Sequence, residues 1–160
     1  MVEKLLFDGY YTIMDTPRTA DYDGIRQAYT AARESDHSTQ VGAVCGVGVG
    51  YNKALDSENP DVRIHAEVMC LLMNARNGVA TQGRTMYAPW APCGDCAMAI
   101  VTAGIARVVV HHQRMQRTPP KWEGPVHDGL SLLKRSNVKV EAIDQDLGEW
   151  MRIGNEEVVL

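Results

Sequence analysis

The chain has 160 residues, of which 45% are hydrophobic and 22% charged, and its formal net charge is −4. These values are typical of a soluble globular protein and argue against the broad basic surface that binds long nucleic acids. No apolar stretch is long enough to cross a bilayer, and Met1 to Leu6 lack a signal-peptide pattern. Four cysteines, two of them in a C-x-x-C pattern, favour a reducing compartment. We therefore expect a cytoplasmic protein with no membrane partner.

The first third of the chain predicts a helix followed by glycine-rich strand structure. Residues 1–20 are expected to be irregular. Thr19 or Asp21 is suited to cap a helix that runs to about Ser35, with apolar residues at helical spacing. The β-branched, glycine-rich run 40–50 then predicts one strand or a very tight hairpin, with glycines in the turn.

A loop over residues 51–64 leads to a second helix, which begins near His65. Val68, Leu72 and Ala75 lie at helical spacing in this segment. They therefore predict the stripe by which the helix packs on the core.

The second half of the chain continues to alternate between strands and helices. In chain order we expect a strand at 84–88, a helix after Cys93, a buried strand at 107–111, a helix at 125–135 and a strand at 138–143. The tail 144–160 is expected to cover the core as a helix, with an oligomer contact as the alternative. Together these elements predict one domain over residues 1–160 with an α/β fold, a three-layer sandwich.

Two short segments, H-A-E at residues 65–67 and P-C-G-D-C at residues 92–96, carry the clearest chemical signal. One histidine and two cysteines are three metal ligands, and they leave the fourth tetrahedral position of zinc free for water. Zinc lowers the pKa of such a water to about 7, and the unligated carboxylate of Glu67 is suited to carry its proton. We therefore predict one catalytic Zn2+ per chain, with the ligands His65, Cys93 and Cys96.

Local geometry agrees with this assignment. Cys93 and Cys96 are spaced i, i+3, on the same side of a helical turn, and Pro92 suits the first turn of that helix. The positive end of the helix dipole then favours both cysteines as thiolates. His65 and Glu67 would point in nearly opposite directions in a regular helix. We therefore place His65 at the very start of its helix.

Two other interpretations of this cluster stay open. The cysteines and the histidine can be ordinary buried side chains, since a free cysteine is often a small core residue. Alternatively, the zinc site is structural and has a fourth protein ligand. The candidates for that ligand are Cys45, Cys70, His111 and His112. Both cysteines lie in apolar segments and are expected in the core, while the histidines end a strand.

Further segments extend the pattern: Q-V-G-A-V at 40–44, G-Y-N at 50–52 and A-G-I-A-R-V-V at 103–109. In this order, and together with the H-A-E and P-C-x-x-C motifs, they resemble the deoxycytidylate (dCMP) deaminase family of the cytidine deaminase-like superfamily. The resemblance covers about residues 21–143. It implies a five-stranded mixed sheet flanked by helices, zinc at the three predicted ligands, and Glu67 as proton shuttle.

The same resemblance implies contacts with the substrate. Asn52 is the candidate for a contact with the sugar, with a simple turn residue as the alternative. The backbone N–H of Ala66 would hold the pyrimidine carbonyl, and the carbonyl of Ala91 would accept a hydrogen bond from the exocyclic amine.

Other residues are candidates for binding a nucleotide. Trp90 is expected to be a packed aromatic beside the pocket, in preference to a base-stacking residue. Ser35 and Thr39 are further candidates for nucleotide contacts. The basic, aromatic loop 114–122 could reach a substrate phosphate, but a solvated connecting loop is the default expectation.

The resemblance implies hydrolytic deamination of a cytosine nucleotide, with dCMP to dUMP and ammonia as the first choice and no redox cofactor. The alternatives are deamination of another aminated ring (a nucleoside, a free base, a purine or a base in RNA) and a noncatalytic zinc-bearing nucleotide-binding protein. Glu67 argues against the last, because a structural site does not require an unligated carboxylate. Family members are commonly homo-oligomers, often hexamers, so a homo-oligomer is expected.

Overall fold

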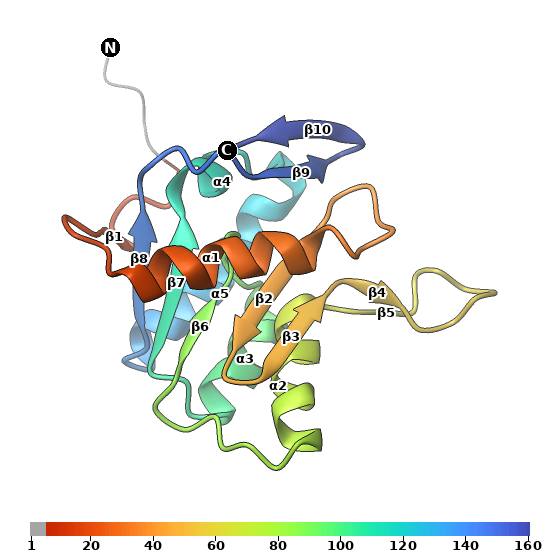
Figure 1. Ribbon diagram of the computed structural model, residues 1–160, viewed down its shortest axis with the longest axis horizontal. Helices are drawn as coiled ribbons and strands as arrows, with labels where there is room; N and C mark the ends of the chain where they lie inside the picture. Colours follow the sequence, from red (N-terminus) through yellow and green to blue (C-terminus); the bar gives the residue numbers. More distant parts are fainter. Residues whose placement is uncertain (1–5) are drawn as a thin grey trace.

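The computed structural model describes residues 6–160, so residues 1–5, including most of the segment assessed for a signal peptide, lie outside it. In the described part, the core is a six-stranded mixed sheet in the order β1-β8-β7-β6-β2-β3 (Figure 1). Its strands are β1 (Thr12–Ile13), β2 (Gly42–Cys45), β3 (Gly48–Tyr51), β6 (Thr85–Tyr87), β7 (Arg107–His111) and β8 (Lys139–Ile143). Strands β6, β7, β8 and β1 are parallel, whereas β2 is antiparallel to both β3 and β6.

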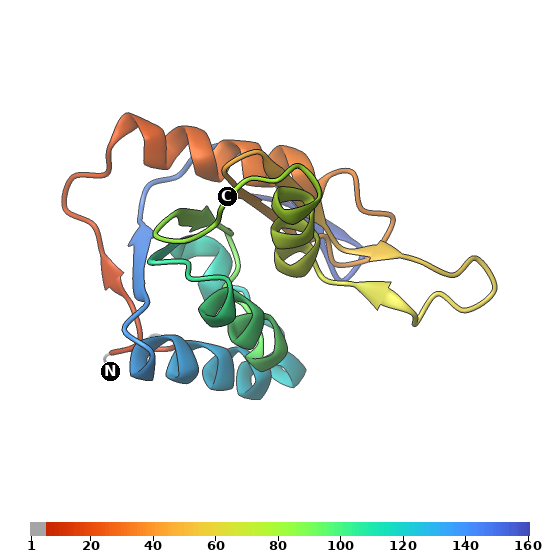
Figure 2. The same cartoon turned by 90° about the horizontal axis from the view of Figure 1, so that it is seen from below.

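Helices cover both faces of this sheet, as the lower view shows (Figure 2). They are α1 (Thr19–Ala32) on one face and α2 (Ala66–Arg76), α3 (Gly94–Thr102) and α5 (Pro120–Arg135) on the other. Successive residues of strand β7 point to opposite faces of the sheet and so enter two different cores. Val109 packs with Ile25 and Tyr29 of α1. Val108 and Val110 belong to the core on the opposite face. The predicted α/β/α class is confirmed. The sheet has one strand more than the expected five, the two-residue β1 at its edge.

The N-terminal segment is less irregular than expected. Strand β1 pairs with β8, and helix α1 begins at Thr19 and ends at Ala32, three residues before the predicted end. The N-cap residue is Arg18, whose backbone N–H donates to Asp21 at 3.1 Å. Asp21 therefore stabilises the helix start from inside the first turn.

The glycine-rich run forms the tight hairpin that was one of its two predicted structures. Strands β2 and β3 pair directly, and Gly46 occupies the left-handed region in the two-residue turn (φ +56°). The predicted loop 51–64 differs, since its ends form a second ladder. This ladder, β4 (Lys53–Ala54) with β5 (Arg63–Ile64), forms the base of the arm that projects from the body in Figures 1 and 2.

The buried face of α2 is not the predicted stripe. Leu72 is 55% exposed and Ala75 is also exposed. The residues that α2 buries are Ala66, Glu67, Cys70, Leu71 and Asn74. Small residues face the sheet because β3 packs backbone to backbone on the helix: a Cβ on Gly50 would lie 1.9 Å from the carbonyl oxygen of Ala66.

The C-terminal third also differs in detail. Arg114 in the predicted solvated loop is fully buried in a short helix, α4 (His112–Gln116), and α5 begins at Pro120, five residues before its predicted start. The tail covers the core as expected, since Met151 and Leu160 are buried, but it does so as a hairpin of β9 (Trp150–Ile153) and β10 (Glu156–Val159). Among residues 6–160, no helix has the length and apolar character needed to span a membrane.

Candidate metal centre and pocket

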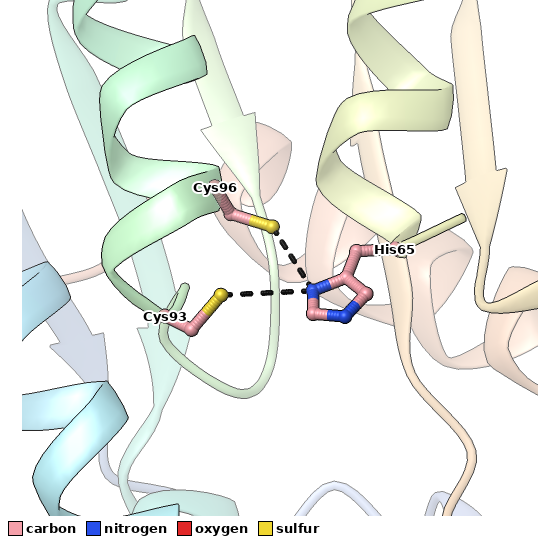
Figure 3. Close-up of side chains that lie close together, drawn as sticks. All are labelled: His65, Cys93 and Cys96. Carbon is pink, nitrogen blue, oxygen red and sulfur yellow. Dashed lines mark hydrogen bonds between the residues drawn. The ribbon is translucent and has the colours of Figure 1, made fainter. Parts of the chain in front are cut away.

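Two helix starts bring the predicted metal ligands together (Figure 3). His65 is the N-cap residue of α2, as predicted, and Cys93 is the N-cap residue of α3. The His65 Nδ1 atom lies 3.3 Å from the sulfur of Cys96 and 3.6 Å from the sulfur of Cys93. In a tetrahedral site with zinc bonds of about 2.0–2.3 Å, neighbouring ligand atoms lie about 3.3–3.8 Å apart. The donor set and its spacing therefore fit a zinc ion.

The structure brings no fourth ligand to this cluster within residues 6–160, where the three residues alone form a group of His, Cys, Asp or Glu donors with metal-binding spacing. Cys45 and Cys70 are buried in the core, as predicted. His111 lies between the hydroxyl of Tyr29 (2.6 Å) and the carbonyl of Gln145 (2.8 Å), so both its ring nitrogens have partners. The arrangement has the ligand number of a catalytic zinc site.

Close packing fixes the loop that carries Cys93. Gly129 of α5 lies against it, and a Cβ at that position would be 2.0 Å from the carbonyl oxygen of Pro92 and 2.8 Å from the carbonyl carbon of Cys93. Gly50 supports Ala66 in the same way on the other side of the site. Both metal-binding helix starts therefore depend on glycines distant in sequence.

The electrostatics of the cluster are uneven. Hydrogen bonds from Cys96 and His65 outweigh burial and lower the pKa of the Cys93 thiol to about 4, which favours its thiolate form. The thiolate of Cys93, burial and the nearby carboxylate of Glu67 together raise the pKa of Cys96. A bound divalent cation is the charge that would favour the thiolate form of both cysteines, as expected from the sequence.

Glu67 points into the same site without belonging to the ligand set. Its side chain is 4% exposed, and its Oε2 atom lies 3.5 Å from the sulfur of Cys96. Burial raises the pKa of the Glu67 carboxyl. A carboxyl group with a raised pKa beside a metal site is suited to accept and release protons.

A pocket with a cavity volume of about 320 Å³ opens above the cluster. His65, Glu67 and Cys93 lie in its wall, and Trp90, Trp122 and Val126 make much of the lining apolar. Three basic residues, His37, Arg63 and Lys121, also line it. The lining thus holds more basic than acidic residues, although Arg63 is paired with Asp36 at 3.1 Å and the chain carries a net charge of −4.

Most of the predicted substrate contacts lie at this pocket. It is lined by Thr39, Asn52, Ala66, Trp90 and Ala91. Ser35 is not among the lining residues; it is buried, and its hydroxyl donates to the carbonyl of Asn52 at 2.7 Å. Its position gives no support to the expected nucleotide contact.

Asn52 ties the pocket wall together. Its Oδ1 accepts from the N–H of Val41 at 2.9 Å, and its Nδ2 donates to the carbonyl of Thr39 at 2.9 Å.

Ala66 is the first residue of α2, so its backbone N–H lies outside the ladder of helical hydrogen bonds.

Trp90 is held on three sides. Its Nε1–H donates to Thr118 at 2.9 Å, the Arg114 guanidinium lies 4.2 Å from its ring centroid, and Trp122 meets it edge to face at 5.9 Å. Burial lowers the pKa of Arg114 to about 10, so this residue remains a cation at neutral pH. Trp90 is thus a fixed wall of the pocket.

No sequence pattern had singled out several of the residues that line the pocket. These are His37, Ser38, Arg63 and Gly154. Lys121 and Trp122 belong to the basic, aromatic segment, whose composition was the available signal. Gly154 comes from the C-terminal hairpin and reaches the site only through the tertiary fold.

Comparison with known proteins places this geometry in context. Residues 18–112, more than half of the chain, match the model of the cytidine and deoxycytidylate deaminase zinc-binding region. A deoxycytidylate deaminase of Enterobacteria phage T2 is 34% identical over 87 residues, covering 54% of this chain and 46% of the relative. The human deoxycytidylate deaminase is 33% identical over 104 residues, covering 50% and 57%. The chain thus spans about half the length of these relatives.

Solved structures share the fold. The dCMP deaminase from cyanophage S-TIM5 superposes with a TM-score of 0.64 at 21% identity, covering 80% of this chain and 100% of that chain. Acinetobacter baumannii RibD gives a TM-score of 0.57 at 25% identity, covering 76% of this chain and 34% of that chain. The arrangement of sheet and helices is therefore shared by proteins of quite different length.

Proposed function

The chain belongs to the cytidine and deoxycytidylate deaminase zinc-binding family, and on this basis we propose that it hydrolyses dCMP to dUMP and ammonia. The observation that carries the proposal is the set of three metal donors beside the buried, unligated Glu67. The matched T2 and human relatives are both deoxycytidylate deaminases. In this reaction the oxygen of water bonds to C4 of the cytosine ring, the bond from C4 to the exocyclic nitrogen breaks, and ammonia leaves.

His65, Cys93 and Cys96 would hold Zn2+, which when bound supplies a Lewis acid that makes water nucleophilic at neutral pH. Glu67 takes a proton from the attacking water and delivers it to N3, and it then carries a second proton to the departing amine. The N–H of Ala66 holds the ring carbonyl, and the carbonyl of Ala91 accepts from the amine.

The basic residues favour a nucleotide over a free nucleoside. His37, Arg63 and Lys121 line the pocket, and Arg63 also pairs with Asp36 at 3.1 Å. A single phosphate needs only such a local basic site, whereas a polynucleotide would need a longer basic surface. This contrast favours a mononucleotide substrate over a base in RNA.

Ammonia release by the zinc-loaded protein from a substrate panel tests the proposal. The panel contains dCMP, CMP, dCTP, deoxycytidine, cytosine, adenosine and guanine. Fastest release from dCMP supports the proposal, and faster release from a purine or a free base would favour deamination of another aminated ring. Bound zinc with no release from any member would favour a noncatalytic protein.

We also propose that copies of this chain associate through the outer surface of α2 and α3. The largest oligomer that we expect is a hexamer. Leu72 and Met98 are each 55% exposed, and they line one shallow surface with Val68 and Ala75. Leu72→Lys should lower the molar mass measured by light scattering, whereas Val159→Lys, which changes an exposed residue on β10, should not.

The cysteine chemistry supports a cytoplasmic location. All four cysteines are free, and the metal cluster needs Cys93 and Cys96 as reduced thiols. An intact site after expression in an oxidising compartment, with one zinc retained per chain, would contradict the need for a reducing environment.

A further inference from the structure

Two segments more than 110 residues apart meet at the outer wall of the pocket. One is the loop after α1, from which His37, Ser38 and Thr39 line the pocket, and the other is the turn between β9 and β10, from which Gly154 does. Figure 1 shows the C-terminal hairpin lying beside this loop. The N–H of Gly154 donates to the Thr39 hydroxyl at 2.9 Å, and the N–H of Asn155 donates to the carbonyl of Ser38 at 3.0 Å. The turn and the loop therefore form one continuous wall.

The hydrogen bonds continue behind the wall. The N–H of Gln40 donates to the carbonyl of Arg152 at 2.9 Å, and the N–H of Arg152 donates to the Gln40 side chain at 2.9 Å. Gln40 is 1% exposed, so these bonds are shielded from water.

The base of the hairpin is anchored in the protein. Met151 and Leu160 are buried in the core that contains Tyr29. Glu149 and Leu160 exchange backbone hydrogen bonds at 2.8 and 2.9 Å, and the Glu149 carboxylate pairs with Arg33 at 2.9 Å. The rest of the fold therefore holds the hairpin in place.

The turn itself is tight. Gly154 and Asn155 both have positive φ (+60° and +71°), as the central residues of a two-residue type I′ hairpin turn do. A Cβ at Gly154 would meet no heavy atom within 4 Å, so a side chain there has space.

The turn lies at the rim of the pocket, away from the buried end where the reaction would take place. Glu67 marks the buried end of the pocket, whereas Gly154 and Lys121 are exposed and lie at its rim. A ring that reacts at Glu67 directs its remaining part toward this rim, where Lys121 lies.

We propose that the Gly154–Asn155 turn is a specificity element that, with the His37–Thr39 loop, encloses the phosphate-bearing end of the substrate. This inference rests on the proposed function. The turn lies outside residues 18–112, the region that matches the family model. Selection for a phosphorylated substrate is thus assigned in part to the chain's own C-terminal hairpin.

A matched pair of substitutions tests this inference. Gly154→Asn and Gly154→Asp add side chains of the same shape, both residue types tolerate positive φ, and only aspartate adds a negative charge. If a phosphate lies beside the turn, Gly154→Asp should raise KM for dCMP about tenfold over Gly154→Asn, through like-charge repulsion. We expect kcat to be equal in the two variants, and KM for deoxycytidine to be equal as well.

Gly148 provides the control. It has positive φ (+65°) and is exposed, and a Cβ added there would meet no heavy atom within 4 Å, but it does not line the pocket. Gly148→Asn and Gly148→Asp should therefore give equal KM values for dCMP. Equal KM values for the Gly154 pair, or the same ratio in the Gly148 pair, would overturn the inference.

Calorimetric binding of dUMP separates this inference from the proposed reaction, because product binding needs no turnover. Weaker binding by Gly154→Asp than by Gly154→Asn supports the specificity element even if dCMP is not deaminated. Equal binding by the pair overturns it. Failure of the wild type to release ammonia would contradict the proposed reaction alone.

Discussion

Gly129 of α5 and Pro92, the residue before the first metal-binding cysteine, are in backbone contact. A Cβ at position 129 would lie 2.0 Å from the Pro92 carbonyl oxygen, so α5 must shift, or Cys93 must move, if a side chain is added. We expect Gly129→Ala to destabilise the fold by about 1–3 kcal/mol and to weaken zinc binding. Gly124→Ala on the same helix meets no atom within 4 Å, so it should leave zinc binding unchanged and, because alanine is the better helix former, raise stability by up to about 1 kcal/mol. Thermal unfolding and competition with a chelator measure both effects, and equal behaviour of the two variants would show that this contact does not position Cys93.

Removal of a metal donor should abolish zinc binding without a general loss of structure. Cys93→Ala leaves two of the three protein ligands, and we expect the purified variant to hold almost no zinc where the wild type holds about one per chain. Cys45→Ala changes a buried core cysteine and should retain the metal. Elemental analysis gives the zinc content, and circular dichroism checks the fold. Full zinc occupancy in Cys93→Ala would exclude this residue as a ligand.

Glu67 should be needed for turnover and not for the metal. Glu67→Gln keeps the shape of the side chain but removes its capacity to carry a proton, so we expect kcat to fall by about 10³-fold or more. Zinc content should match that of the wild type, because the three donors are unchanged. Steady-state kinetics on protein of known zinc content measure the loss. A variant with near-wild-type kcat would contradict the role given to Glu67.

Asp21, at the start of α1, should make the fold sensitive to acid. Its carboxylate is 1% exposed and accepts hydrogen bonds from Arg107 at 2.8 and 3.2 Å. Burial raises the pKa of the Asp21 carboxyl, but the hydrogen bonds from Arg107 and Arg18 outweigh burial, and the pKa is lowered. An unfolded aspartate has a pKa of about 3.9, so the stabilisation is complete above about pH 5 and is lost as the pH falls below about 4.

Asp21→Asn should therefore lower the free energy of unfolding at pH 7 by about 3 kcal/mol and make its decrease between about pH 5 and pH 3 shallower. Urea unfolding over a pH series measures both. Asp128→Asn alters an exposed carboxylate and serves as the control. An unchanged pH slope in Asp21→Asn would show that the buried ion pair does not set the acid stability.

Much of the fold could be predicted because its elements have clear local patterns. The β-branched run at 107–111 is strand β7, and the glycine-rich run at 40–50 is the β2–β3 hairpin. The prediction of which residues α2 buries was wrong. Gly50 permits backbone contact at Ala66, and this contact turns the small-residue face of the helix inward. Hydrophobic periodicity alone cannot show such a contact. The C-terminal hairpin was also missed, although the pair Gly154-Asn155 is itself a two-residue turn signal.

The candidate site likewise has a part that short motifs predict and a part that only the tertiary fold brings together. The metal ligands and Glu67 belong to short motifs with fixed spacing, so the sequence alone brought them together. The outer wall comes from loops that share no motif, and Arg63 and Gly154 reach it only when the sheet, the arm and the hairpin are in place. Ser35 differs from both, since a polar residue beside a motif was expected at the substrate, whereas its hydroxyl donates to the carbonyl of Asn52 and it does not line the pocket.

The most direct test of the account is the formation of dUMP from dCMP by the zinc-loaded protein, followed by chromatography and compared with deoxyuridine formation from deoxycytidine. The account predicts stoichiometric dUMP and ammonia, with kcat/KM for dCMP about 10- to 100-fold above that for deoxycytidine, since a charged phosphate contact contributes roughly 1.5–3 kcal/mol. No dUMP from protein that holds one zinc per chain, or equal kcat/KM for the two substrates, would contradict it.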